Sequence, residues 1–184
     1  GLDVEGVESH ILRDRVRAIL GARPFRQNLE SRGIFIQHVT EHKQTPTVQR
    51  WKFGLTVAGF GRPLPTKIEF SRRGLDDGVA FGSLQPSLVG AYQLATFMAS
   101  HYSAAAALRQ KTGALAHRTE TQARDLFDVH HLLASGAPRD TLREMDAGTL
   151  DLARLRAASI GFPMFRSQVW TYLASEDQPQ FASP

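Results

Sequence analysis

A lysine and a glutamate alternate with apolar residues in the stretch 66–73, Thr-Lys-Ile-Glu-Phe-Ser-Arg-Arg. In an extended strand, Ile68 and Phe70 would face a core. Lys67 and Glu69 would then share the opposite face. A carboxylate fixed on a strand is a suitable magnesium ligand, because hard cations prefer oxygen ligands, and the neighbouring cations would attract phosphates. The alternative is an outward strand face with ordinary solvated charges, which this stretch taken alone favours.

A second group of charged residues lies in two predicted helices further along the chain. Lys111 and Arg118 belong to the first helix and its end. Asp125 and Asp128 belong to the second, and their spacing of three places them on one side of it. If the helices form a tight hairpin, Lys111 or Arg118 could hold a triphosphate while the aspartates orient these cations. The equal alternative is a structural ion-pair network that ties the hairpin together.

Other residues capable of chemistry form weaker patterns. Asp76-Asp77 lies in a glycine-flanked stretch that is more typical of a turn than of a metal site. His38 and His42 are four apart but not on a predicted helix, so a zinc site is not favoured. His130-His131 is typical of a helix surface. The sequence has no Gly-x-x-x-x-Gly-Lys loop and no serine nucleophile motif, so P-loop and serine-hydrolase chemistry find no support.

The elements that must position these residues fall into two halves, and the first is rich in strands. An amphipathic helix is predicted over 7–20, ending at Gly21 and Pro24. In the stretch 47–57, Trp51 and Phe53 fall on one face and polar residues on the other. Strands are predicted at 34–40, 47–57 and 66–71, with a short one around 79–81.

The second half is rich in alanine and leucine and is predicted to be helical. Ser103 is a plausible N-cap for a helix that runs to about Arg118. Thr119 and Gln122 have the spacing of a capping box, which would start a second helix that ends at Gly136. Shorter helices are predicted near 139–145 and 164–173. The chain is therefore predicted to be α+β, with domains at 1–86 and 87–184.

The composition is that of a folded, positively charged chain. Of the 184 residues, 42% are hydrophobic, which suffices for a core. The net charge of +4 comes mostly from arginine, whose forked guanidinium suits phosphate, although composition alone favours an ordinary arginine-rich surface. The absence of cysteine excludes disulfides and thiolate metal sites and suits the cytoplasm. No apolar run approaches the roughly 18 residues of a membrane span.

Two blocks of the sequence, taken together, resemble a known family. One is the strand 66–71, and the other runs from Gln110-Lys111 through Ala114-Leu-Ala-His-Arg118 and Gln122-Ala-Arg-Asp-Leu-Phe-Asp128 to Leu132-Leu133. In order and approximate spacing they are similar to the AbiEii/AbiGii-like nucleotidyltransferase toxins of type IV toxin–antitoxin systems. The resemblance covers roughly residues 2–175. It implies a partial nucleotidyltransferase-like mixed sheet with flanking helices, followed by a helical C-terminal half.

The resemblance also implies a reaction and the residues that serve it. The reaction would transfer a nucleoside monophosphate from an NTP to an acceptor, with the 3′ end of a tRNA as one candidate. Mg²⁺ would be held by carboxylates, and a cognate antitoxin protein would be the partner. Catalytic roles would fall to Glu69, Lys111 and Asp125, with Glu69 as a metal ligand. Nucleotide binding would involve Lys67, Lys111, Arg118, Arg124 and Asp128.

The resemblance has one conspicuous departure, at the start of the chain. The family carries a glycine turn and an Asp-x-Asp or Asp-x-Glu pair before its first long helix. Only Leu2-Asp-Val-Glu5 precedes that helix here, and Asp3 and Glu5 follow no glycine turn. We therefore expect the sequence as given to be incomplete and inactive in transfer. The alternative is a non-catalytic module of the same fold that binds RNA or a partner protein.

Overall fold

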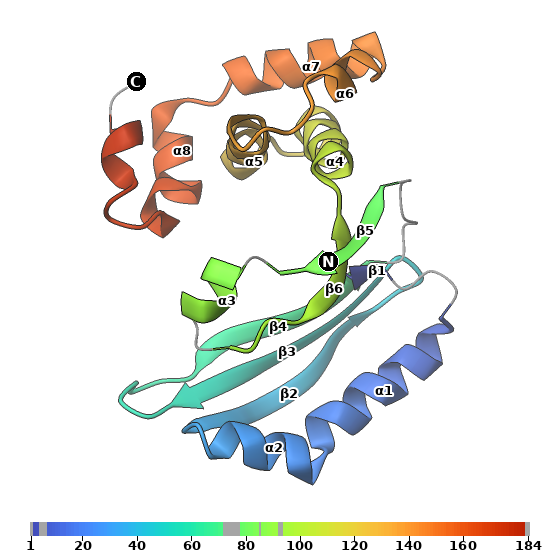
Figure 1. The fold of residues 1–184 in the computed structure, drawn as a ribbon, viewed down its shortest axis with the longest axis vertical. Helices are drawn as coiled ribbons and strands as arrows, with labels where there is room; N and C mark the ends of the chain where they lie inside the picture. The colour runs from blue at the N-terminus through green and yellow to red at the C-terminus, as the bar shows by residue number, and fades with distance from the viewer. Residues whose placement is uncertain (1, 4–6, 72–77, 85, 92–93, 183–184) are drawn as a thin grey trace. The chain divides into compact units, whose positions relative to one another are not determined.

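The computed structural model describes residues 2–3, 7–71, 78–84, 86–91 and 94–182 (Figure 1). The chain forms two compact units, Gly1–Leu75 and Asp76–Pro184, here called the sheet unit and the helical unit. The α+β class predicted from the sequence is confirmed. This division places the strand near residue 80 in the helical unit. The domain boundary at residue 86 was inferred from the change from predicted strands to predicted helices, and it stays a prediction.

The sheet unit contains a four-stranded sheet of order β1-β4-β3-β2. Its strands are β1 (Leu2–Asp3), β2 (Ile34–Gln44), β3 (Val48–Val57) and β4 (Leu64–Ser71). β1 runs parallel to β4, and the other neighbours are antiparallel. The register of β3 with β4 sets Arg50 opposite Glu69 and Lys52 opposite Lys67. These four charged residues therefore share one face of the sheet.

Two helices, α1 (Ser9–Gly21) and α2 (Arg23–Glu30), lie along the sheet (Figure 1). Leu12, Val16 and Leu20 of α1 pack with Trp51 in the core of this unit. The Trp51 ring meets Phe70 edge-on at a centroid distance of 5.9 Å. The apolar faces predicted for the second and third strands are thereby confirmed. The charged residues occupy the opposite face, here called the open face.

The first helix ends at Gly21 as predicted, but two other sequence predictions for the sheet unit are wrong. Pro24 does not end a helical region but lies in the first turn of α2. Its missing N–H costs no intrahelical bond there, so the residue starts a helix as readily as it stops one. β2 continues past Thr40 to Gln44, and the register shifts on both sides of Thr40. Such bulges allow a polar, irregular segment to remain in the sheet.

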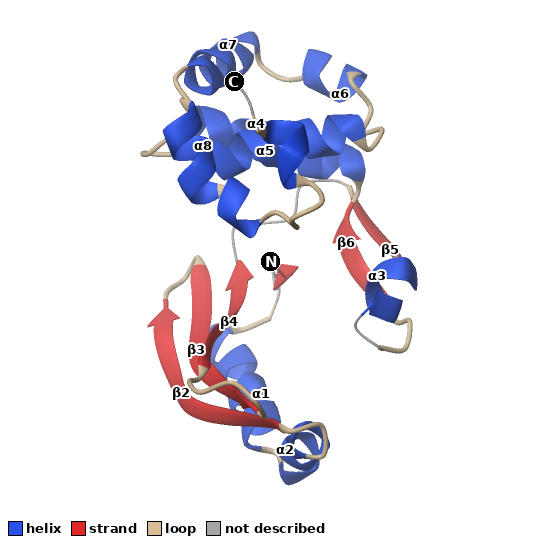
Figure 2. Cartoon of the chain, turned by 90° about the vertical axis from the view of Figure 1, so that its left-hand side faces the viewer, coloured by secondary structure: helices blue, strands red, loops and turns tan. Residues whose placement is uncertain are grey.

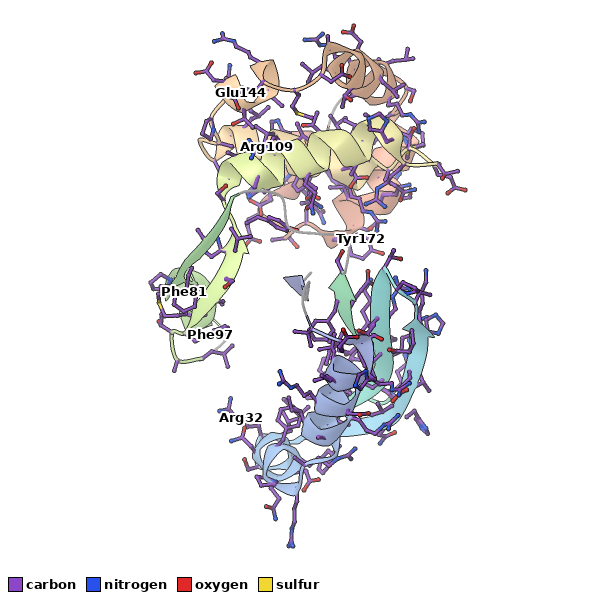
Figure 3. All side chains as sticks on the ribbon, turned by 90° about the vertical axis from the view of Figure 1, so that its right-hand side faces the viewer. Arg32, Phe81, Phe97, Arg109, Glu144 and Tyr172 are labelled. Atoms are coloured by element: carbon purple, nitrogen blue, oxygen red, sulfur yellow. The ribbon has the colours of Figure 1, made fainter. Side chains whose placement is uncertain are left out.

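The helical unit begins with an antiparallel pair of strands, β5 (Val79–Ser83) and β6 (Met98–Tyr102), with α3 (Pro86–Ala91) between them. Figure 3 labels two aromatic residues of this part, Phe81 on β5 and Phe97 just before β6, and both are exposed. The helices that follow are α4 (Ala104–His117), α5 (Ala123–Ala134), α6 (Asp140–Arg143), α7 (Ala147–Ala158) and α8 (Phe162–Gln168), then the 3-10 turns η1 (Trp170–Tyr172) and η2 (Gln178–Phe181). Within the described residues, no helix is both long and apolar enough to cross a membrane.

The helices α5, α6 and α7 of this unit pack against α4, and α8 packs against α5 (Figure 2). Leu115 and Ala116 of α4 form a buried cluster with Ala153 of α7. The predicted cap of α4 is confirmed, because the Ser103 hydroxyl accepts a hydrogen bond from the Ala106 N–H at 3.2 Å. This cap fixes where α4 begins and therefore which of its residues face α5.

The predicted start of α5 and the account of the later helices need correction. Gln122 is the N-cap of α5, but its side chain makes no capping hydrogen bond, so no Thr-x-x-Gln capping box forms. The Ala123 N–H instead donates to Gln168 Oε1 at 2.8 Å, a long-range contact that local spacing cannot reveal. The bounds of α7 were not predicted from the sequence, because its apolar residues do not form one stripe along the helix. Ala153 is buried, whereas Leu155 is exposed.

Candidate functional site

The open face of the sheet unit holds the first group of candidate residues around Glu69 on β4. Glu69 Oε2 accepts a hydrogen bond from Arg50 Nε at 2.6 Å, across the β3–β4 pair. Lys67 Nζ lies 3.9 Å from the same oxygen. The Glu69 side chain keeps 33% of its surface exposed, so this carboxylate is held by two cations and still reaches solvent.

The cations around Glu69 keep it ionised. The hydrogen bond from Arg50 lowers the pKa of the Glu69 carboxyl below its ordinary value, against an opposing effect of partial burial. The positive charges of Arg50, Lys67 and Lys43 lower that pKa further. A carboxylate that stays charged at neutral pH can act as a metal ligand, but here Arg50 already occupies one of its oxygens.

The described residues do not by themselves complete a metal site around Glu69. In the part of the chain that the structure describes, no three acidic, histidine or cysteine side chains gather in a way that could hold a metal ion. Asp3 lies on the neighbouring strand in register with Ser71, whereas Glu5 lies outside the described residues, as do Asp76 and Asp77. A hard cation needs several oxygen ligands, and Glu69 supplies one carboxylate.

The second group of candidates lies in the helical hairpin of α4 and α5. Lys111 Nζ lies 2.5 Å from Asp128 Oδ2, and their side chains are 34% and 37% exposed. Arg118, just after α4, pairs with Asp125 in the first turn of α5. Both aspartates therefore face α4, as their spacing on one side of a helix predicted. The structure joins Lys111 with Asp128 and Arg118 with Asp125.

Burial distinguishes these two ion pairs. The Asp125 side chain is 1% exposed, whereas that of Arg118 is 43% exposed. Arg118 Nη2 donates to Asp125 Oδ1 at 3.2 Å, and Arg118 Nε lies 2.5 Å from Oδ2. The contact at Oδ2 is a charge contact and not a hydrogen bond. A buried carboxylate at a helix N-terminus with one arginine partner is mainly a structural element.

Two residues outside the predicted site hold the loop of this hairpin. Arg156 of α7 donates from Nη1 to the Arg118 carbonyl at 2.8 Å and to Thr121 Oγ1 at 3.2 Å. Gln168 caps α5 as described above. No local pattern could have found them, because they act from 35 to 45 residues further along the chain. Arg124, which the resemblance places in the site, is exposed and makes no side-chain bond within the described residues.

Comparison with known proteins gives a family match and two structural likenesses. A family model described as the nucleotidyl transferase AbiEii toxin of type IV toxin–antitoxin systems matches residues 4–168. The chain is similar to the crystal structure of JHP933 from Helicobacter pylori, with 16% identity, coverage of 85% and 73% of the two chains, and a TM-score of 0.44. The chain is also similar to a candidate nucleotidyltransferase from H. pylori, with 17% sequence identity and a TM-score of 0.41. That match covers 74% of this chain and 74% of the other. No curated protein matches.

The family match spans most of the chain and includes both groups of candidate residues. The chain therefore belongs to the AbiEii family of nucleotidyltransferase toxins. The family of type IV toxin–antitoxin proteins implies a nucleotide as substrate and an antitoxin as partner. The resemblance inferred from the sequence is thus confirmed.

Proposed function

We propose that this chain binds the nucleotide in the transfer of a nucleoside monophosphate from an NTP to an acceptor. The observation that carries the proposal is the ion pairing of the hairpin motif in a chain of the AbiEii family. The motif places two cations, Lys111 and Arg118, each beside a carboxylate that holds it. Prepositioned cations suit a triphosphate, because little reorganisation is needed when the charge arrives.

Lys111 is the residue that we propose to contact the triphosphate directly. Its ammonium is about one third exposed and is held by Asp128, which is itself accessible. A lysine of this kind can exchange a carboxylate oxygen for a phosphate oxygen without a large desolvation cost. Asp128 would orient the lysine in the empty site and stay close once the ligand binds.

In the second ion pair, Arg118 would contact phosphate and Asp125 would hold Arg118 in place. Asp125 engages Nε and Nη2 of Arg118, and the guanidinium is 43% exposed. A guanidinium has five N–H donors, so the remaining ones can bind phosphate while Asp125 fixes the plane. Asp125 would therefore act on the nucleotide through Arg118, and the exposed Arg124 would add long-range attraction.

On the sheet unit, Glu69 would supply one carboxylate to a magnesium ion, and Lys67 would attract phosphate beside it. Magnesium in such an enzyme neutralises the triphosphate and activates the acceptor hydroxyl. The described residues do not complete its coordination, so we assign no step of the reaction to this chain's metal ligands.

The acceptor would be an RNA, with the 3′ end of a tRNA as the first candidate, and the protein would act in the cytoplasm under the control of its antitoxin. The second candidate function is a binding module of the same fold that holds RNA or a partner protein without transfer. The net charge of +4, carried mostly by arginine, favours either ligand, so composition does not separate the two functions.

Labelling and binding together test the proposal. The 184-residue chain is incubated with each labelled NTP, magnesium and total tRNA, and the binding of each magnesium–NTP complex is measured by calorimetry. We expect measurable NTP binding and little labelling, since Glu69 is the one residue that matches the family's metal carboxylates. Strong labelling that Asp3→Ala abolishes would show that Asp3 and Glu5 supply the acidic pair. A chain that binds no NTP would favour the binding module.

A further inference from the structure

The open face of the sheet unit contains a hollow of about 520 Å³ beyond the Glu69 group. Its volume lies in the range of small-ligand sites in proteins. The residues that line it include His38, Lys52, Gly54, Pro63, Pro65 and Lys67. None of these residues except Lys67 has a role in the nucleotide-binding proposal.

Two lysines meet in this hollow without a carboxylate between them. Lys52 and Lys67 are directly opposite each other in the β3–β4 pair, so their side chains leave the sheet close together. Like charges in this position destabilise a sheet. Lys67 lies 3.9 Å from Glu69, and within the described residues Lys52 has no acidic partner. An anionic ligand would relieve this repulsion.

The positive charge continues along the same face in a line that also contains Glu69, the partner of Arg50. Arg50 lies two residues from Lys52 on β3, and Lys43 of β2 is its register partner. The line is longer than a single phosphate group, because each step of two residues along a strand spans roughly 6.6 Å. A polyanion with regularly spaced charges fits this line better than an isolated phosphate.

The other end of the hollow is apolar and shaped by an unusual backbone. Pro63 packs so closely over β3 that a Cβ on Gly54 would lie 2.9 Å from its Cβ. His38 lies at the β2 bulge with a φ of 52°, a conformation that residues other than glycine seldom adopt. Backbone strain of this kind clusters at ligand sites, and an exposed imidazole can stack on a nucleobase.

We propose that this hollow binds single-stranded nucleic acid, with phosphodiesters on Lys52 and Lys67 and one base against His38 and the prolines. The inference rests on the proposed function, for which it supplies the site of the acceptor strand on the sheet unit. The phosphate of a free NTP has the same chemistry, so the test must separate the two ligands.

The test compares two double variants that lose the same charge. Lys52→Ala with Lys67→Ala removes the lysine pair. Arg15→Ala with Arg23→Ala removes two exposed arginines from the helices on the other side of the sheet. Binding of a fluorescent single-stranded RNA is followed by anisotropy at several salt concentrations. Binding of magnesium–NTP is measured by calorimetry, and thermal melts report folding.

We expect the lysine variant to bind RNA about tenfold or more weakly and the arginine variant to bind like the parent. The slope of log affinity against log salt should fall by about 1.4 in the lysine variant, at about 0.7 per phosphate contact of a single strand. Magnesium–NTP binding should weaken less than RNA binding, because Lys67 only attracts phosphate beside Glu69 whereas Lys111 and Arg118 of the hairpin are unchanged. The melting temperature should stay equal or rise, because the like-charge repulsion is removed. His38→Gly should weaken RNA binding about fivefold or more.

Several outcomes would overturn the inference. A parent that binds no RNA would contradict it, as would a lysine variant that binds RNA normally. Equal losses in both double variants would show an effect of net charge alone. Loss of magnesium–NTP binding with RNA binding intact would make the hollow a site for free nucleotide. The two proposals can also fail separately. If the lysine variant binds RNA more weakly as expected but Lys111→Ala binds NTP normally, the RNA site in the hollow is supported and the proposed nucleotide site in the hairpin is contradicted.

Discussion

Glu69 in the sheet unit and Asp125 in the helical unit are both carboxylates paired with an arginine, yet their surroundings differ. The Glu69 side chain is 33% exposed and its Arg50 partner 28% exposed. The Asp125 side chain is 1% exposed, and its Arg118 partner is 43% exposed. Glu69 can exchange its partner for water or a ligand, whereas Asp125 would be left as a buried charge.

This difference divides the family motif into groups with separate tasks. Lys111 and Asp128 resemble Glu69 in burial, because both side chains keep about a third of their surface exposed. We therefore propose direct ligand binding for these accessible pairs, whereas Asp125 would support the hairpin and act on a ligand only through Arg118. The structure shows the ion-pair network that was one of the two alternatives for the hairpin, and triphosphate binding, the other alternative, stays a proposal.

The largest effect is expected for Asp125→Ala. The substitution removes a buried charge partner from Arg118 and an acidic residue from the first turn of α5. It should lower the free energy of unfolding by roughly 3 kcal/mol, at the lower end of the range for broken buried pairs because Arg118 is partly exposed. Urea unfolding measures this loss. Asp128→Ala is the matched control on the same helix and should cost about 1 kcal/mol or less.

A second pair of variants compares the two arginines. Arg118→Ala leaves Asp125 buried without its partner and should cost about 2–3 kcal/mol. Arg50→Ala leaves Glu69 able to bind water and should cost about 1 kcal/mol or less. Thermal melts of the two variants side by side decide the matter. Equal losses of stability in the two variants would contradict the view that burial makes the Arg118–Asp125 pair more important for folding than the Arg50–Glu69 pair.

Much of this arrangement can be predicted from sequence, where short-range periodicity determines it. Alternation along β3 and β4 predicts Trp51 and Phe70 in the core and Glu69 on the opposite face, as found. The partner of Glu69 could also have been predicted, because Arg50 lies on the polar face of the adjacent predicted strand. The spacing of Asp125 and Asp128 predicts their common face toward α4.

The remaining contacts depend on residues far apart in sequence, which no local pattern encodes. Arg156 and Gln168 reach back to the hairpin from α7 and α8. Asp125 and Asp128 are the same residue type on the same helix face, so the sequence pattern cannot distinguish them. Their different burial depends on the packing of other helices around α4. The bulge at His38 is likewise a property of strand register. The roles of all these residues in catalysis and binding remain predictions.

A smaller effect is expected in the pH dependence of Glu69→Gln. The pKa of Glu69 is lower in the folded protein than its ordinary value of 4.5, so the ionised form stabilises the fold. That stability is present above pH 4.5 and is lost as the pH falls through the lowered pKa. The parent should therefore lose up to about 1 kcal/mol more than Glu69→Gln on acidification. Parallel loss in urea titrations at pH 7 and below pH 4.5 would contradict the assigned role of Arg50.

Lys111→Ala is expected to have the smallest effect on stability. It is also the most direct test of the proposed nucleotide site in the hairpin. Calorimetric titration of magnesium–NTP into this variant and the parent, with thermal melts of both, separates binding from folding. We expect the variant to bind NTP at least about tenfold more weakly, with a nearly unchanged melting temperature, because a part-exposed ion pair adds at most about 1 kcal/mol to stability. A variant that melts far below the parent yet binds NTP normally would show that Lys111 is structural. It would also contradict the nucleotide site proposed for the hairpin.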